Sequence, residues 1–176
     1  MKLLKKYRFF IVTICIVGIL LVFDKNIGVK AFNVAMYSFK EMILIIPPIF
    51  VLLGLLDVWV PRETMVKYMG SDSGLKGIVL AIFLGSAAAG PLYGAFPIAA
   101  VFMKKGASFS NILIFLGAWS TTKIPMFLFE LSALGTKFAL TRLAVNIPGI
   151  ILIAYIVNRL LKDKEISGIY ENANNF

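Results

Sequence analysis

Residues 85–97 read GSAAAGPLYGAFP, and this stretch decides which folds the chain can adopt. It holds three glycines and two prolines, and it lies inside an uncharged segment, residues 77–103. A single helix of that length would be roughly 40 Å long, whereas the hydrocarbon core of a bilayer is roughly 30 Å thick. Because proline and glycine disfavour a helix interior, we expect two half-helices separated by a break near Gly90.

Non-helical backbone survives at membrane depth only where protein buries it or where it lines a wet cavity. Two arrangements satisfy this condition. Residues 77–103 form either a hairpin that re-enters the side from which it came or a broken helix that crosses the membrane.

The rest of the chain is organised around four further apolar stretches. We expect residues 7–23, 42–60, 108–134 and 136–161 to cross the bilayer as helices, with Pro47 and Pro48 kinking the second. The sequence thus predicts an all-α polytopic membrane protein with about four spanning helices and a broken or re-entrant hairpin. We expect one membrane domain over residues 1–176, with a bundle over 1–161 and a polar, frayed tail over 162–176.

Composition excludes several classes of function. Of the 176 residues, 60% are hydrophobic and only 15% are charged, far from the pattern of a soluble domain. The chain has no histidine and a single cysteine, Cys15, so a metal site and a histidine-dependent enzyme are not expected. No basic stripe supports nucleic-acid binding, and no motif indicates a cofactor. The net charge of +9 fits contact with a lipid bilayer.

The distribution of lysine and arginine favours the hairpin. With re-entry, four basic residues lie on one side of the membrane (Lys25, Lys30, Lys137, Arg142) and twelve on the other: Lys2, Lys5, Lys6, Arg8, Arg62, Lys67, Lys76, Lys104, Lys105, Arg159, Lys162 and Lys164. If the segment crosses instead, the two sides hold nine and seven. Cytoplasmic loops are enriched in such residues, so we expect both termini inside, in a bacterial inner membrane.

Lys123 is the main candidate for chemistry, because it lies near the middle of an otherwise apolar span. A charge at that depth costs a few kcal/mol and must face a partner or water. Pro125 leaves the carbonyl of Thr121 without its usual donor. The functional interpretation is an anion or proton site; the alternatives are a structural ion pair with Glu41 or Glu130, or a lysine that extends to the membrane surface.

The remaining candidates lie around the Gly/Pro break and along the Lys123 helix. We expect a substrate pathway in which the break faces Lys123 across a cavity, formed by Gly90, Pro91, Tyr93, Pro97, Thr121, Thr122, Lys123 and Glu130. Small residues at helical spacing also serve close packing in membranes. This interpretation assigns helix contacts to Gly85, Ala89 and Gly94.

These residues carry a resemblance to a known family. The patterns Gly85…Gly90-Pro91-Leu92-Tyr93…Pro97, the turn over residues 104–108 and Trp119-Ser120…Lys123-Ile124-Pro125 resemble the bacterial predicted-permease family that includes the ArsP organoarsenical permeases and YraQ. Members are about twice as long, with two related halves. The resemblance therefore implies a half-size transport protein that works as a homodimer; organoarsenical export would use thiols, and Cys15 lies outside the matching motifs.

Two functions stay open at this point. The first is a permease subunit that moves a small molecule or ion, with an anion as the expected chemistry. The alternative is a substrate-binding membrane subunit of a larger transport complex. An intramembrane enzyme is disfavoured, because the sequence has neither a nucleophile–base pair nor a metal-binding motif.

Overall fold

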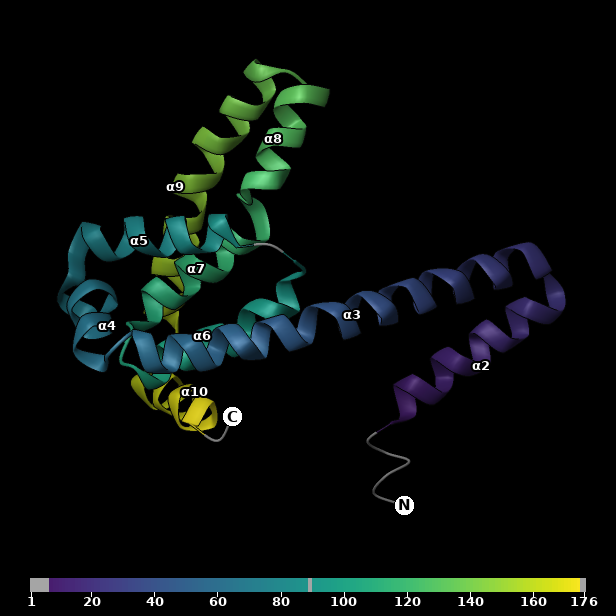
Figure 1. Ribbon diagram of the computed structural model, residues 1–176, viewed down its shortest axis with the longest axis horizontal. Helices are drawn as coiled ribbons and strands as arrows, with labels where there is room; N and C mark the ends of the chain where they lie inside the picture. Colours follow the sequence, from purple (N-terminus) through teal and green to yellow (C-terminus); the bar gives the residue numbers. More distant parts are fainter. Residues whose placement is uncertain (1–6, 89, 175–176) are drawn as a thin grey trace. The chain divides into compact units, whose positions relative to one another are not determined.

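The computed structural model describes residues 7–88 and 90–174, and over these residues it contains helices and turns without a strand (Figure 1). The all-α class is therefore confirmed. The elements are α2 (Arg8–Phe23), α3 (Lys25–Trp59), α4 (Arg62–Met69), η1 (Ser71–Ser73), α5 (Gly74–Ala87), η2 (Leu92–Gly94), α6 (Ala95–Lys104), α7 (Phe109–Thr121), α8 (Ile124–Ala133), α9 (Thr136–Leu160) and α10 (Asp163–Asn174).

The chain forms two compact units, Met1–Pro48 and Ile49–Phe176. The boundary falls directly after Pro47 and Pro48 inside α3, where two backbone donors are missing. In the first unit, Asp24 caps α3 by accepting hydrogen bonds from the backbone N–H groups of Asn26 (3.0 Å) and Ile27 (3.2 Å). A single membrane domain over the whole chain stays a prediction.

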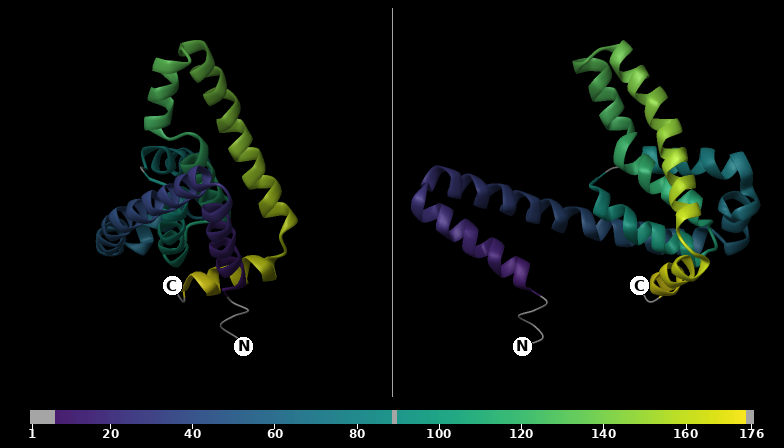
Figure 2. Two further views of the ribbon diagram at one scale, coloured as in Figure 1. Left: turned by 90° about the vertical axis from the view of Figure 1, so that its right-hand side faces the viewer. Right: turned by 180° about the vertical axis from the view of Figure 1, so that it is seen from behind.

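Two stretches of 25 residues, Phe109–Ala133 and Thr136–Leu160, are long and apolar enough to cross a membrane. Only 33% and 11% of their apolar windows are buried, so most of this surface does not pack within the chain as a soluble core would. Both views in Figure 2 show α8 beside α9. The structure thus supports two of the four expected spans; those over residues 7–23 and 42–60 stay predictions.

The long uncharged segment is broken where the sequence predicts. Helix α5 ends at Ala87, a 3₁₀ turn follows at Leu92–Gly94, and α6 begins at Ala95. The segments that flank the two helices meet, because the N–H of Ser108, after α6, donates to the carbonyl of Met69, before α5, at 2.8 Å. The chain therefore doubles back between α5 and α6 (Figure 1).

A glycine turn joins α6 to α7. The N–H of Ala107 bonds to the carbonyl of Phe102, and the N–H of Gly106 bonds to Met103, with Gly106 at φ 87°. These two backbone hydrogen bonds, together with the left-handed glycine, form a Schellman motif. The neighbouring Lys105 is 7% exposed and donates to the carbonyl of Val60 at 2.6 Å, so this lysine is a structural clamp rather than a free loop charge.

Helix α5 packs closely against α7. Gly85 permits this approach, since a Cβ there would lie 2.5 Å from the Phe115 carbonyl oxygen and 2.8 Å from the Ala118 Cβ. Beside it, the rings of Phe102, Phe115 and Trp119 stack edge to face at centroid distances of 5.2 and 5.6 Å. This contact is the centre of the core of the second unit.

Replacing Gly85 with alanine should destabilise the protein by about 1–3 kcal/mol, because the added methyl meets backbone atoms that cannot move cheaply. Thermal unfolding in detergent measures the effect. The matched control is Gly149→Ala in α9, where an added Cβ meets nothing within 4 Å and helix propensity favours alanine. Equal unfolding temperatures for the two variants would contradict the close contact.

The expected continuous helix over residues 108–134 is wrong. Helix α7 ends at Thr121, and α8 begins at Ile124, with Lys123 as its N-cap residue. Pro125 lies in the first turn of α8. Backbone N–H groups there have no acceptor within the helix, so proline's lack of an N–H costs no hydrogen bond. The proline therefore starts a second helix rather than kinking one long helix.

The expected frayed C-terminal tail is also wrong over Asp163–Asn174, which form α10. Glu165 caps this helix by accepting from the N–H of Lys162 at 2.8 Å. Helix α10 packs against α6, and the Tyr170 hydroxyl donates to the carbonyl of Ala107 at 2.7 Å. Burial of one tyrosine face stabilises a segment whose overall composition is polar.

Burial raises the pKa of Tyr170 above its ordinary value of 10.0. The folded state thus favours the neutral phenol. The contribution of Tyr170 to folding stability is therefore present below about pH 10 and is lost as the pH rises through the raised pKa. Tyr170→Phe should cost about 1 kcal/mol at pH 8 and lose less stability than the parent above pH 10. Unfolding temperatures across this range test it, with exposed Tyr68→Phe as the control. Parallel curves for parent and Tyr170→Phe would contradict the contact.

Candidate functional site

The break between α5 and α6 exposes one backbone carbonyl to neighbouring side chains. Gly90 adopts φ 102°, a left-handed conformation that a side chain rarely tolerates. Pro91 follows with φ −72° and ψ 158°, extended backbone that lacks an N–H. The Gly90 carbonyl therefore lies outside any helical hydrogen-bond ladder and needs side-chain donors.

The break between α7 and α8 supplies those donors. The Lys123 Nζ and the Trp119 Nε1 (3.3 Å) both donate to the carbonyl oxygen of Gly90. Next to them, the hydroxyls of Ser86 and Thr122 are 2.8 Å apart and share a hydrogen bond. The sequence placed Lys123 opposite Gly90 across a cavity; in the structure the two are in direct contact.

A charged pair adjoins this contact. Arg142 of α9 donates to the carbonyl of Thr121 at 3.1 Å and forms an ion pair with Glu130 of α8, whose side chain is 7% exposed. The Thr121 carbonyl, expected to be a free acceptor, is thus occupied by a guanidinium. The alternative pairing of Lys123 with Glu130 is not what the structure shows, and the side chain of Glu41 lies outside the described residues.

The two threonine hydroxyls of the predicted pathway also bond within their own helix. Thr121 Oγ1 donates to the carbonyl of Gly117 at 2.9 Å, and Thr122 Oγ1 approaches that of Ala118 at 3.0 Å. Around Thr121, Thr122, Glu130 and Arg142 the free space is about 10 Å³. That is roughly room for one water molecule, so these groups form a closed polar cluster.

The other predicted site residues lie at the edge of this arrangement. Tyr93 is 42% exposed in the 3₁₀ turn, and Pro97 is half-buried in the first turn of α6. Gly94 is buried, and a Cβ there would meet the Ile49 side chain at 2.6 Å. Ala89 lies outside the described residues.

Two helix breaks meet here, one between α5 and α6 and one between α7 and α8, and we call them the paired breaks. Their electrostatics favour negative charge near Lys123. A helix N-terminus carries partial positive charge, and a C-terminus carries partial negative charge. Lys123 adds its ammonium to the N-terminus of α8, while Arg142 compensates the carbonyl end of α7. The Gly90 carbonyl is the acceptor that balances this concentration of donors.

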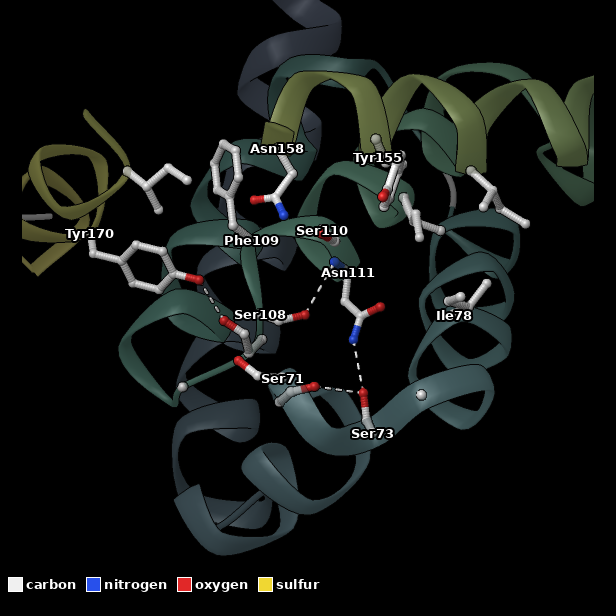
Figure 3. A pocket seen from close by; sticks show the side chains of 18 residues that line it. Ser71, Ser73, Ile78, Ser108, Phe109, Ser110, Asn111, Tyr155, Asn158 and Tyr170 are labelled. Carbon is white, nitrogen blue, oxygen red and sulfur yellow. Dashed lines mark hydrogen bonds between the residues drawn. The ribbon is translucent and has the colours of Figure 1, made fainter. Parts of the chain in front are cut away.

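A second polar feature lies at the opposite ends of α5 and α7. A cavity of about 660 Å³ opens between η1, the start of α7, the end of α9 and α10 (Figure 3). None of the described residues that line it is charged. Hydroxyl and amide side chains contribute much of its wall: Ser71, Ser73, Ser108, Ser110, Asn111, Tyr155, Asn158 and Tyr170.

Asn111 connects this cavity to the fold. Its side chain is 4% exposed, and its Nδ2 donates to the Met69 carbonyl at 2.9 Å and to Ser73 Oγ at 3.0 Å. Figure 3 shows the bond to Ser73 within the cavity wall. Asn111 therefore fixes η1 against α7 and shapes the cavity floor.

Sequence reasoning missed Ser86, Trp119 and Arg142 as members of the site. Arg142 had a usable signal, since it lies well inside a predicted span, where a charge needs a partner. Glu130 and Arg142 also lie at similar sequence separations before and after the turn at Gly135. Two antiparallel helices joined by that turn place such residues side by side. Trp119 carried no such signal, because a tryptophan in an apolar helix is commonplace.

The profile of one protein family, described as ArsP_1, predicted permease, matches residues 28–175. Neither the curated proteins nor the solved structures compared with the chain gave a match. The family match covers most of the sequence and agrees with the two apolar stretches long enough to cross a membrane. Together they identify a membrane transport protein. The chain belongs to the ArsP_1 family of predicted permeases.

Proposed function

We propose that this chain is a permease subunit that moves a small anionic or strongly dipolar solute, and that Lys123 and the Gly90 break form its solute site. The contact of Lys123 and Trp119 with one non-helical carbonyl carries this proposal. Discontinuous helices that meet at mid-membrane are the usual way in which transporters present backbone groups to a solute.

The solute would exchange with the Gly90 carbonyl as the acceptor for the Lys123 ammonium. The hydroxyls of Thr121 and Thr122 lie close by and would have to leave the carbonyls of Gly117 and Ala118 to donate to the solute; Tyr93 lies in the adjoining turn. An anion gains from the same ammonium and from the N-terminus of α8. The ammonium and the N-terminus of α8 repel a cation, so we expect the site to select against it.

We further propose that the α5–α6 hairpin re-enters the membrane with both its ends on the cytoplasmic side of a bacterial inner membrane. Support comes from the charges of the second unit. The segments around the polar cavity bear Arg62, Lys67, Lys76, Lys104, Arg159 and Lys162, whereas the α8–α9 turn bears Lys137. The cavity then opens to the cytoplasm and serves as the entrance or exit for solute. Both chain termini face the same side.

We propose that the chain is a half-size member of its family and works as a homodimer, in which a second copy completes the pathway. The exposed apolar side chains of α8 and α9, such as Leu128, Phe129 and Val145, supply surface for lipid and for that copy.

Flux through purified protein in proteoliposomes tests the function. Radiolabelled chloride, phosphate, sulfate and acetate serve as probe anions, glycerol as a neutral probe and rubidium as a cation probe. We expect flux of at least one anion above empty liposomes and none of rubidium, from a particle with the mass of two chains. Binding without flux would instead support the substrate-binding subunit, and rubidium flux would contradict the anion site.

A further inference from the structure

We infer that Glu130 is the proton-binding group of the transport cycle, and that its protonation releases the α7–α8 break from the α5–α6 break. This inference rests on the proposed transport function and adds its coupling ion. It starts from the position of the carboxylate. Glu130 is 5% exposed in α8, within one of the two stretches able to cross a membrane.

A buried carboxylate in such a segment is costly unless it serves structure or function. The ion pair joins α8 to α9. Here the partner does more, because the same Arg142 guanidinium that pairs with Glu130 also donates to the Thr121 carbonyl at the end of α7. The charge state of Glu130 therefore acts on the backbone of the break itself.

The contacts continue from Thr121 to the solute site. The next residue, Thr122, bonds to Ser86 of α5 at 2.8 Å, and the one after it, Lys123, bonds to Gly90. Three consecutive residues thus join the Arg142–Glu130 pair to the end of α5 and to Gly90 in the break. A change in the pair has a direct covalent route to the groups proposed to hold the solute.

Protonation changes this arrangement in a defined way. Glu130 takes one proton from the aqueous side to which the pathway is open, and its carboxylate becomes a neutral acid. The ion pair with Arg142 is then lost, and the guanidinium no longer has the contact that positions it against the Thr121 carbonyl. When Glu130 ionises again toward the opposite side, one proton has crossed the membrane with each cycle.

The other charged groups of α8 and α9 near Glu130 are cations. The cations of the two packed helices α8 and α9 closest to it along the chain are Lys123, Lys137 and Arg142. Carboxyl groups ordinarily bind a proton at a lower pH than that at which lysine and arginine side chains lose one. Glu130 is the carboxylate that α8 and α9 contribute to this interface, and it is therefore the group to which we assign the proton.

The test follows the indole of Trp119, which is 3% exposed and bonds to the Gly90 carbonyl. The chain has two tryptophans, so the full-length Trp59→Phe variant in nanodiscs leaves Trp119 as the reporter. We expect its emission to shift to longer wavelength as the pH falls from about 8 to about 4, because the break opens and water reaches the ring. No solute is needed, so the outcome is independent of whether any probe anion is transported.

Adding Glu130→Gln should abolish the shift, whereas Glu130→Asp should keep it. The matched control is Glu63→Gln, which removes an exposed carboxylate in α4 and should leave the shift unchanged. If Glu130→Gln does not fold, the double variant Glu130→Gln/Arg142→Gln removes both charges and carries the same test. A pH-dependent shift that survives loss of the Glu130 carboxylate, or a parent without any shift, would overturn the inference.

Discussion

Replacing Lys123 with methionine should reduce anion flux in proteoliposomes about 10- to 100-fold, the loss expected when one charge-assisted hydrogen bond worth about 1.5–3 kcal/mol is removed. Methionine keeps an unbranched chain of similar length, so the packing between the two breaks is largely preserved. The Gly90 carbonyl also keeps its bond from Trp119. The variant therefore separates the charge of Lys123 from its contribution to structure.

The matched control is Lys137→Met, which removes an exposed charge at the beginning of α9. We expect flux near that of the parent, because this side chain lies at the end of a span and outside the paired breaks. Unfolding temperature and particle mass should match the parent in both variants. Normal flux in Lys123→Met would show that the lysine is structural and that the solute site lies elsewhere.

The break at Gly90 was predictable because it depends on local chemistry. A left-handed φ calls for glycine, and proline stops a helix regardless of what packs around it. The encounter of Lys123 with that break was also foreseeable, since both are costly in a membrane and each lowers the cost of the other. What the sequence could not supply was the direct contact, which depends on how closely α5 and α7 approach.

Features that depend on register between helices were beyond sequence reasoning. Arg142 reaches both Glu130 and Thr121 only because α9 passes the α7–α8 break at one particular height. Charge counting instead placed Arg142 with the basic residues on one side of the membrane. Charge counting likewise placed Lys105 with the basic residues of the cytoplasmic side, and the position of the α3 end makes it a buried donor to Val60. Long-range partners decide these cases.

Replacing Arg142 with glutamine should destabilise the protein by about 3–5 kcal/mol, the usual cost of breaking a buried ion pair from one side. The variant leaves the Glu130 carboxylate, with a side chain only 7% exposed, without its cation, and it takes the guanidinium from the Thr121 carbonyl. Thermal or denaturant unfolding in detergent at about pH 8 measures the loss. Lys137→Gln, an exposed position on the same helix, should stay within about 0.5 kcal/mol of the parent.

The double variant Glu130→Gln/Arg142→Gln decides whether the cost comes from the unpaired charge or from lost packing. If the charge dominates, removing the carboxylate as well should recover most of the stability, because two neutral amides can bond to each other and to the Thr121 carbonyl without a buried charge. The double variant would then be more stable than Arg142→Gln, and its stability would no longer depend on the ionisation of Glu130. If it is instead as unstable as the single variant, the guanidinium acts mainly through Thr121 and through its bulk. The order of these two stabilities therefore establishes whether Glu130 is held charged by Arg142 in the folded protein, which is the condition for a proton to change the site.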